Sequence, residues 1–324
     1  MNAQLVDAES GTHLWADQFD ATHADQLQTQ DDIVARLTRA MHLELPEAEI
    51  ARVKRASVAK PDAEDLALQC QLAFLKNEVV FASEAIATDS PCEQALAADP
   101  NNVRALTWSA VRSMPSLGRG YVPGDDLKRA DVLLSKALAL DPKYAPAHLL
   151  NAFLLQAQFR LEEAVAEDRR ALELDPSLAD AYGHMGFVLR RLGEFQASLE
   201  SIDKAIWLSP HDPFRSLWYA DKAGSYLALK QYDQAIESAR RSVAINPNNA
   251  GSYFYLPVAL ALAGQESQAH EALERYVALP EARKTLAAWK RMRPQFVNAN
   301  TDPRYVQYYD LLLDGLRKAG LPEE

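Results

Sequence analysis

The sequence predicts an all-α solenoid of helical hairpins, preceded by a small β-hairpin and one further helix. Three observations predict it. Ala and Leu are abundant while the 324 residues include only 12 Gly, a balance that favours helices over strands. Apolar residues recur at helical spacing on both sides of a regularly placed break. A short sequence pattern that ends in proline recurs at intervals of 42, 34, 34, 37 and 33 residues. Its prolines are Pro100, Pro142, Pro176, Pro210, Pro247 and Pro280.

The first 60 residues do not show the repeat pattern. Residues 4–8 and 13–19 look like two strands, and Glu9–Thr12 between them predicts a hairpin turn. Residues 25–41 predict an amphipathic helix. An isolated hairpin is only marginally stable in water. We therefore expect residues 1–60 to be a partial α/β segment rather than a complete domain.

The repeat region begins with a less regular pair of helices. Residues 62–76 predict the first helix, and residues 83–100 predict its partner. Ser90 and Glu93 form a capping-box pattern around Pro91, so the partner helix is expected to start near Pro91. The next unit carries extra residues at 113–123, which predict a long connection between its helices.

The unit at residues 179–210 shows why the interval corresponds to a hairpin. Two apolar stripes flank Gly193, which ends the first helix, and Pro210 ends the second. The small residues Gly186, Ser198 and Ala205 lie where the two helices must approach closely. Two units later, Pro257 falls inside a first helix and is expected to shorten or kink it.

These units resemble tetratricopeptide repeats, which place an aromatic residue, Leu-Gly, Tyr, Ala, Phe, Ala and Pro at set offsets in 34 residues. Several units agree in phase, although His148 replaces the first aromatic residue and Asp168 replaces a large apolar residue. The resemblance implies a right-handed superhelix of about six helix pairs over residues 61–280. It also implies capping helices in residues 281–324, at 283–291 and 302–318.

Both ends of the chain carry a second resemblance. The stretch NAQLVDAESGTHLWADQFD resembles the end of a TolB-like N-terminal domain, and LLLDGLRKAGLPEE is similar to the tail of cyclase-linked repeat arrays. In bacteria such segments accompany class III adenylate/guanylate cyclase domains or winged-helix regulatory domains. This resemblance implies that the chain is the C-terminal region of a longer bacterial signalling protein whose effector domain lies outside it.

Composition excludes several classes of partner. The net charge of −11 opposes non-specific binding to nucleic acid or anionic lipid, and no apolar run approaches the length of a membrane helix. The first ten residues lack the basic and apolar regions of a signal peptide. Cys70 and Cys92 are too few to staple a chain of this size and fit a reducing compartment. We therefore expect a cytoplasmic protein without membrane insertion.

No motif for chemistry is present. The sequence has no HExxH, CxxC, GxxxxGK, GxGxxG or GxSxG pattern. His148 and His184 stand about one repeat apart on first helices, and packing or solvent contact explains them better than metal binding. Paired carboxylates such as Glu162 and Glu163 begin helices, where the helix dipole favours them. We expect no catalytic, cofactor-binding or metal-binding residues and hence no enzyme.

What remains is a surface that binds a protein or peptide. By the resemblance, the first helix of each unit lines a concave groove, and an aromatic lining with one arginine suits an apolar or mixed peptide helix. The Lys, Asn and Arg residues of the family's carboxylate clamp are mostly missing. The predicted groove residues are Leu149, Phe153, Gln156, Asp180, Phe187, Arg190, Leu217, Phe254 and Val258.

Two functional hypotheses stay open at this stage. The first is a repeat scaffold that holds a protein or peptide in its groove. The second is a regulatory or oligomerising arm of a cyclase or winged-helix regulator. In either case the unpaired edge of the N-terminal hairpin predicts a homodimer through residues 1–20.

Overall fold

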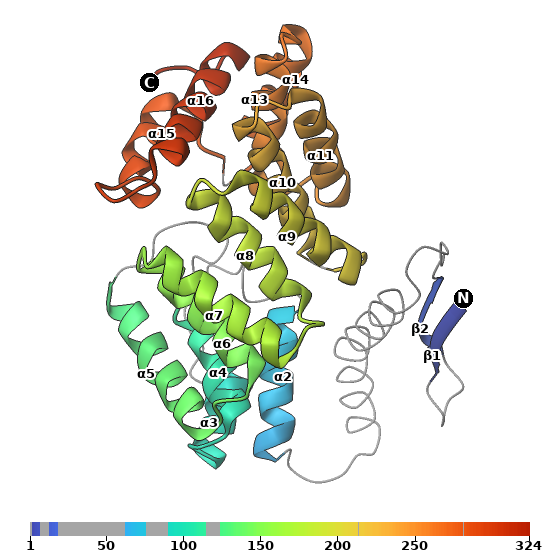
Figure 1. Cartoon of the computed structure of the whole chain (residues 1–324), viewed down its shortest axis with the longest axis vertical. Coiled ribbons are helices and arrows are strands. Elements are labelled where there is room, and N and C mark those ends of the chain that lie inside the picture. Colours follow the sequence, from blue (N-terminus) through green and yellow to red (C-terminus); the bar gives the residue numbers. More distant parts are fainter. Residues whose placement is uncertain are drawn as a thin grey trace. The chain divides into compact units, whose positions relative to one another are not determined.

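The computed structural model describes residues 2–6, 13–18, 62–75, 90–114, 124–212, 214–280 and 282–324. Apart from one hairpin, the regular structure of these residues is helical, which confirms the predicted fold class (Figure 1). Their contacts divide them into an N-terminal unit, within residues 1–158 and 167–179, and a C-terminal unit, within residues 159–166 and 180–324.

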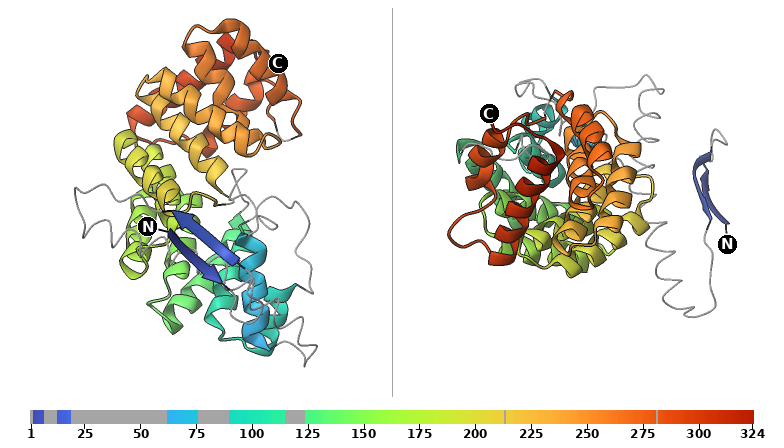
Figure 2. Two further views of the ribbon diagram at one scale, coloured as in Figure 1. Left: turned by 90° about the vertical axis from the view of Figure 1, so that its right-hand side faces the viewer. Right: turned by 90° about the horizontal axis from the view of Figure 1, so that it is seen from above.

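The hairpin consists of β1 (Asn2–Val6) and β2 (His13–Gln18), which are antiparallel and lie side by side (Figure 2). Asn2 pairs with Gln18 and Leu5 with Trp15, and the register shifts between Leu5 and Val6. Two strands thus lie close to the predicted ones, the first at residues 2–6 where 4–8 are predicted. The helix predicted at residues 25–41 lies outside the described residues.

The helices follow the predicted units closely. The N-terminal unit contains α2 (Ala63–Leu75), α3 (Pro91–Ala98), α4 (Val103–Arg112), α5 (Gly124–Leu140), α6 (Ala145–Ala157) and the second half of α7 (Leu161–Leu174). In the C-terminal unit are most of α8 (Ala179–Arg191), then α9 (Phe195–Leu208), α10 (Arg215–Ala228), α11 (Tyr232–Ile245), α12 (Ala250–Tyr253), α13 (Tyr255–Leu262), α14 (Glu266–Val277), α15 (Leu286–Met292) and α16 (Pro303–Ala319).

Two local predictions are confirmed in detail. Helix α3 begins at Pro91, and the Ser90 hydroxyl accepts a hydrogen bond of 3.4 Å from the backbone N–H of Glu93. The first helix of the fourth regular hairpin is split into α12 and α13 at Phe254. Pro257 explains the split, because it has no N–H to donate to the carbonyl four residues earlier.

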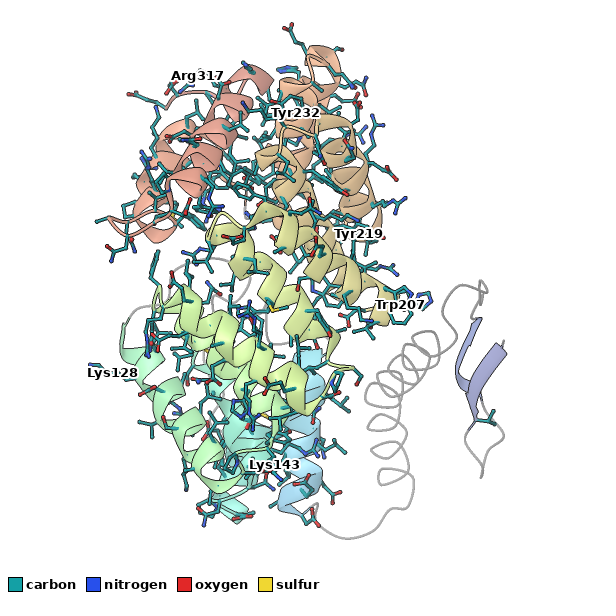
Figure 3. All side chains as sticks on the ribbon, in the orientation of Figure 1. Lys128, Lys143, Trp207, Tyr219, Tyr232 and Arg317 are labelled. Carbon is teal, nitrogen blue, oxygen red and sulfur yellow. A yellow bond between two sulfur atoms is a disulfide. The ribbon has the colours of Figure 1, made fainter. Side chains whose placement is uncertain are left out.

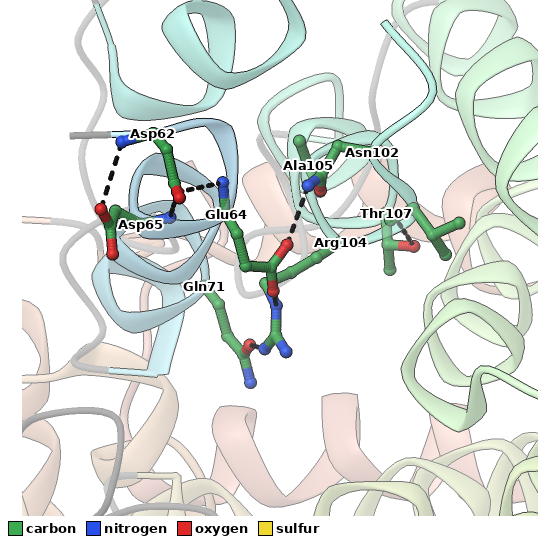
Figure 4. Close-up of polar contacts among 9 residues, drawn as sticks. Asp62, Glu64, Asp65, Gln71, Asn102, Arg104, Ala105 and Thr107 are labelled. Carbon is green, nitrogen blue, oxygen red and sulfur yellow. Dashed lines mark hydrogen bonds and ion pairs between the residues drawn. The ribbon is translucent and has the colours of Figure 1, made fainter. Parts of the chain in front are cut away.

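Polar side chains join α2 and α4, the first helices of two successive units (Figure 4). The Arg104 Nε on α4 donates to Glu64 on α2 at 2.7 Å, and the Asn102 amide donates to the same carboxylate at 2.8 Å. The Asn102 side-chain oxygen also accepts from the backbone N–H of Ala105, so it caps α4. Asn102 thus fixes the start of α4 and also its contact with α2.

Small residues allow the paired helices to approach, as the sequence predicts. A Cβ atom on Gly186 of α8 would lie 2.5 Å from Ile202 Cγ1 and 3.0 Å from the Ser198 carbonyl oxygen on α9. Ser198 and Ala205 are fully buried. The Ser198 hydroxyl lies 2.8 Å from that of Ser225 on α10, which satisfies both groups inside the packed layer.

Cys70 on α2 and Cys92 on α3 form a disulfide, which the sequence does not predict. Their Cα atoms are 5.0 Å apart, within the range of natural disulfides. The bond staples one helix pair, whose buried cluster is small: Leu66, Ala67, Ala95 and Ala105.

The turns inside the hairpins share a left-handed residue. Gly193 ends α8 and Gly264 ends α13, both with φ of 76°. In the equivalent turns after α6 and α10 the position is held by Phe159 and Lys230, with φ of 63° and 59°. Glycine adopts this conformation freely, whereas other residues pay about 1–2 kcal/mol for it. Lys230 is therefore a strained position in an otherwise regular turn.

We expect Lys230→Gly to raise the free energy of unfolding by about 0.5–1 kcal/mol, because it removes this strain at an exposed site. Gly264→Ala is the matched opposite change. Nothing lies within 4 Å of the added Cβ, so its expected loss of about 1 kcal/mol measures backbone strain alone. Urea unfolding followed by circular dichroism measures both. Equal stability of the two variants and the wild type would contradict the assignment.

We expect reduction of the disulfide to lower the free energy of unfolding of the N-terminal unit by about 3 kcal/mol, the value typical for a loop of this length. Urea unfolding with and without dithiothreitol measures the effect. The Cys70→Ala/Cys92→Ala double variant is the control, since reductant should leave its stability unchanged. An equal response of wild type and control would show that the bond is absent.

Candidate functional site: the inner face of the C-terminal unit

The last helix covers the predicted groove of the C-terminal unit. Helix α16 packs on α10, α13 and α14, and it contacts α8 through its tyrosines. We call the surface of α8, α10 and α13 beneath it the inner face. The side chains that α16 buries recur at helical spacing on one of its sides and are at most 7% exposed: Tyr305, Tyr308, Leu312, Leu316 and Ala319.

Tyr308 is at the centre of this contact. Its hydroxyl accepts a hydrogen bond of 3.1 Å from Arg190 Nη1 on α8 and donates to the Tyr255 hydroxyl on α13 at 3.4 Å. On α10, a Cβ atom on Gly224 would lie only 2.7 Å from the Tyr308 hydroxyl. Glycine at this position therefore provides the space for the tyrosine.

Arg190 is buried instead of facing a groove. It is 3% exposed, and its Nη2 donates to Asp221 Oδ1 at 2.6 Å. Its guanidinium carbon lies 5.3, 5.8 and 5.6 Å from the ring centroids of Phe187, Tyr255 and Tyr308. Burial raises the pKa of Asp221, and the neighbouring Arg190 opposes this rise. Burial also raises the pKa of Tyr255 and Tyr308, so both stay neutral hydroxyls.

Arg191, the next residue, is equally buried but has no carboxylate partner in the described contacts. It is 3% exposed and stacks on the Phe159 ring at 4.9 Å. Burial lowers the pKa of Arg191, and the Tyr305 hydroxyl on α16 opposes this by hydrogen bonding. Arg191 Nε and Nη2 have no hydrogen-bond partner, and neither does Arg190 Nε. The inner face therefore keeps unused guanidinium donors.

Helix α15 and α16 cover two further predicted groove residues. Phe254 stacks on Trp289 of α15 with ring centroids 4.4 Å apart. Val258 is fully buried, and a Cβ atom on Gly315 of α16 would lie 2.7 Å from its Cγ1. Both side chains thus belong to the core of the C-terminal unit.

The nine predicted groove residues fall into two groups according to how exposed their side chains are. Four are buried and cannot touch a partner in this arrangement: Leu149, Arg190, Phe254 and Val258. Five are half-buried: Phe153, Gln156, Asp180, Phe187 and Leu217. Leu149, Phe153 and Gln156 lie in the N-terminal unit and the others in the C-terminal unit.

The predicted set lacks Arg191, Asp221 and Tyr255 of the inner face, and of the helix that covers it Tyr305 and Tyr308. The sequence contains a pattern that indicates the burial of Tyr308. Tyr305, Tyr308, Leu312 and Leu316 form an apolar stripe that needs a partner surface. The stripe does not say which surface it covers, because that depends on where the chain returns.

The C-terminal unit also carries cation–aromatic pairs at its surface. Lys204 Nζ lies 4.5 Å from the ring centroid of Trp207 on α9, and the Arg241 guanidinium lies 5.7 Å from that of Tyr219 on α10. Trp207 and Tyr219 are labelled in Figure 3. Long cationic side chains thereby cover aromatic surface while their charges stay in water.

His148 forms an ion pair in the N-terminal unit. Its Nδ1 lies 2.7 Å from Glu167 Oε2, and its Nε2 lies 3.0 Å from the Pro142 carbonyl oxygen. The hydrogen bond to Glu167 raises the pKa of His148, while burial opposes the rise. Within the described part of the chain, no group of three or more His, Cys, Asp and Glu residues could hold a metal ion.

A comparison with protein families identifies the repeats. Residues 179–212 and 219–249 match the family model described as tetratricopeptide repeat. Two units of the C-terminal part of the array thus match this repeat. None of the described helices is both long enough and apolar enough to cross a membrane.

Curated relatives match parts of the chain. The chain is 28% identical over 167 residues to the putative adenylate cyclase 3 of Rhizobium meliloti (strain 1021), which is 51% of this chain and 28% of that protein. It is 31% identical over 136 residues to the type IV pilus assembly protein PilF of Pseudomonas aeruginosa, covering 41% of this chain and 52% of that protein. The chain thus spans from about a quarter to about half of the length of these relatives.

A solved structure supports the fold. The crystal structure of PilW, a widely conserved type IV pilus biogenesis factor, superposes with a TM-score of 0.51 at 23% identity. The match covers 67% of this chain and 96% of that one. At this level of identity the likeness establishes the helical-hairpin fold.

The His148–Glu167 pair predicts a pH-dependent stability. The folded pKa of His148 is raised above its unfolded value of about 6.5, so its contribution is complete below about pH 6.5 and is lost as pH rises through the folded pKa. We expect Glu167→Gln to cost about 1 kcal/mol at about pH 5.5 and less at about pH 8.5. Urea unfolding at the two pH values measures the difference.

Glu163→Gln is the control for this experiment. Glu163 lies on the same helix and pairs with Arg160 at 2.6 Å, but arginine does not titrate in this range. Its small effect should be the same at both pH values. A cost of Glu167→Gln that does not depend on pH would refute the contribution of the charged histidine.

Proposed function

We propose that this chain is a non-catalytic scaffold that binds a protein or peptide through the first helices of its hairpins. The observation that carries the proposal is a half-buried phenylalanine at the same position of two successive repeats, Phe153 on α6 and Phe187 on α8. A packed core would bury these rings fully, whereas a binding surface leaves part of an aromatic ring for a partner.

The relatives agree with a role in assembly. PilF is named as a pilus assembly protein, and a third relative, from Drosophila melanogaster, is named as a homologue of a BBSome complex member. The latter is 24% identical over 157 residues, which is 32% of that protein. These names refer to an assembly process and to a protein complex, and a role in assembly for this chain is our proposal.

A second candidate is a regulatory or oligomerising arm of an adenylate/guanylate cyclase or a winged-helix regulator. The match to the putative adenylate cyclase of Rhizobium meliloti favours it over an isolated scaffold. Reading the coding sequence in frame upstream of Met1 discriminates between them. A cyclase or winged-helix sequence there supports the second candidate, and a stop codon removes it.

Peptide selection tests the scaffold proposal. Helical peptides displayed on phage would be selected against the immobilised chain, and the affinities of the selected peptides would be measured by fluorescence anisotropy. We expect Phe153→Ala to weaken about tenfold the binding of peptides held by the N-terminal unit, and Phe187→Ala that of peptides held by the C-terminal unit, since truncating an aromatic anchor typically costs about 1–2 kcal/mol or more.

The matched control is Val132→Ala on the outer side of α5, where the side chain is 66% exposed. It removes exposed apolar surface away from the first helices and should leave affinity unchanged. Thermal unfolding of each variant separates loss of binding from loss of fold. If no peptide is selected, or if folded variants bind equally well, the scaffold proposal is wrong.

A further inference from the structure

The inner face carries more positive charge than its contacts neutralise. Arg190 and Arg191 are both nine-tenths buried or more, and Asp221 pairs with Arg190 alone. Arg191 meets an aromatic ring and a tyrosine hydroxyl, while its Nε and Nη2 donate to nothing. Burying an arginine without a carboxylate is costly, because water solvates the free ion far better.

Helix α16 supplies hydroxyl groups where a carboxylate would fit better. The side chains that it presents to the two arginines are Tyr305 and Tyr308, and burial raises the pKa of Tyr308 so that it stays neutral. The acidic residue that caps the start of the helix, Asp302, pairs with Arg304 instead. An acidic side chain in place of Tyr305 would give Arg191 a charge-assisted hydrogen bond.

The face is shaped for a helix. Gly224 and Gly315 permit the close approach of α16, and Tyr308, Leu312 and Leu316 fill the contact with apolar surface. A second amphipathic helix with the same spacing would fit the same surface. Charge and shape together therefore describe a helical ligand with an acid one turn before its central aromatic residue.

We propose that the inner face binds an amphipathic peptide helix that carries a carboxylate opposite Arg191, and that α16 occupies this site in its absence. The proposal rests on the proposed scaffold function and names the chemistry of its partner. Besides the buried hydrogen bonds of Tyr308 to Arg190 and Tyr255, the polar contacts of α16 include exposed ion pairs such as Arg304 with Glu194 at 3.2 Å. Such pairs contribute little, so the apolar stripe chiefly holds the helix in place.

Two synthetic peptides test the proposal on the full chain. Both have the sequence of residues 302–320, one with Tyr305→Glu and the other with Tyr305→Gln. The chain would carry Leu312→Ala, which weakens its own α16 without touching either arginine. By fluorescence anisotropy we expect the glutamate peptide to bind about tenfold more tightly than the glutamine peptide. Adding Arg191→Met to the chain should abolish this difference.

Hydrogen exchange on the wild-type chain gives a second measurement that does not depend on a variant. A saturating concentration of the glutamate peptide should speed exchange of the amides of residues 305–316, and the glutamine peptide at the same concentration should do so less. Equal binding of the two peptides, a preference that survives Arg191→Met, or unchanged exchange would each overturn the proposal.

The outcome is distinguishable from failure of the scaffold function. If phage-selected peptides bind and lose affinity with Phe153→Ala or Phe187→Ala, the scaffold stands whatever these two peptides do. If selected peptides bind but neither speed exchange of α16 nor respond to Arg191→Met, the acidic-helix proposal fails alone.

Discussion

Each helical hairpin of this chain has an apolar face that it cannot bury by itself. Successive hairpins solve this by stacking, which requires helices close enough for glycine, alanine and serine at their contacts. Gly186 against Ile202 and Ser198 shows how little space is left. The requirement does not end at the last repeat, because the inner surface of α8, α10 and α13 would otherwise face water. Helices α15 and α16 cover it with Trp289, Tyr308, Leu312 and Leu316.

Covering the inner face with α16 buries two arginines, which costs free energy because their charges leave water. Arg190 is compensated by Asp221, by the Tyr308 hydroxyl and by three aromatic rings. Arg191 receives only part of this support. Repeat packing alone would be served better by a neutral side chain, since replacing buried ions by apolar residues is often stabilising. The two arginines therefore mark the place where the face is adapted to something beyond its own packing.

At the start of the repeat region, a disulfide and polar contacts hold the helices together. The first helix pair has a small buried cluster, and the Cys70–Cys92 disulfide joins its two helices. Polar contacts of Glu64 with Arg104 and Asn102 join α2 to the next first-helix. The array thus begins with covalent and polar ties and ends with an apolar cover.

The sequence by itself determined the helical hairpins, because proline, glycine and capping residues act within one turn of their own position. Pro91, Gly193 and Pro257 each set a helix boundary where the sequence predicts one. It also determined the faces that must be buried. Only the tertiary structure decided what covers them. The burial of Arg190, Phe254 and Val258 depends on α15 and α16, which lie far along the chain and can pack on any apolar surface of the right spacing. The pairing of Cys70 with Cys92 likewise depends on two helices meeting in space, which spacing along the chain does not reveal.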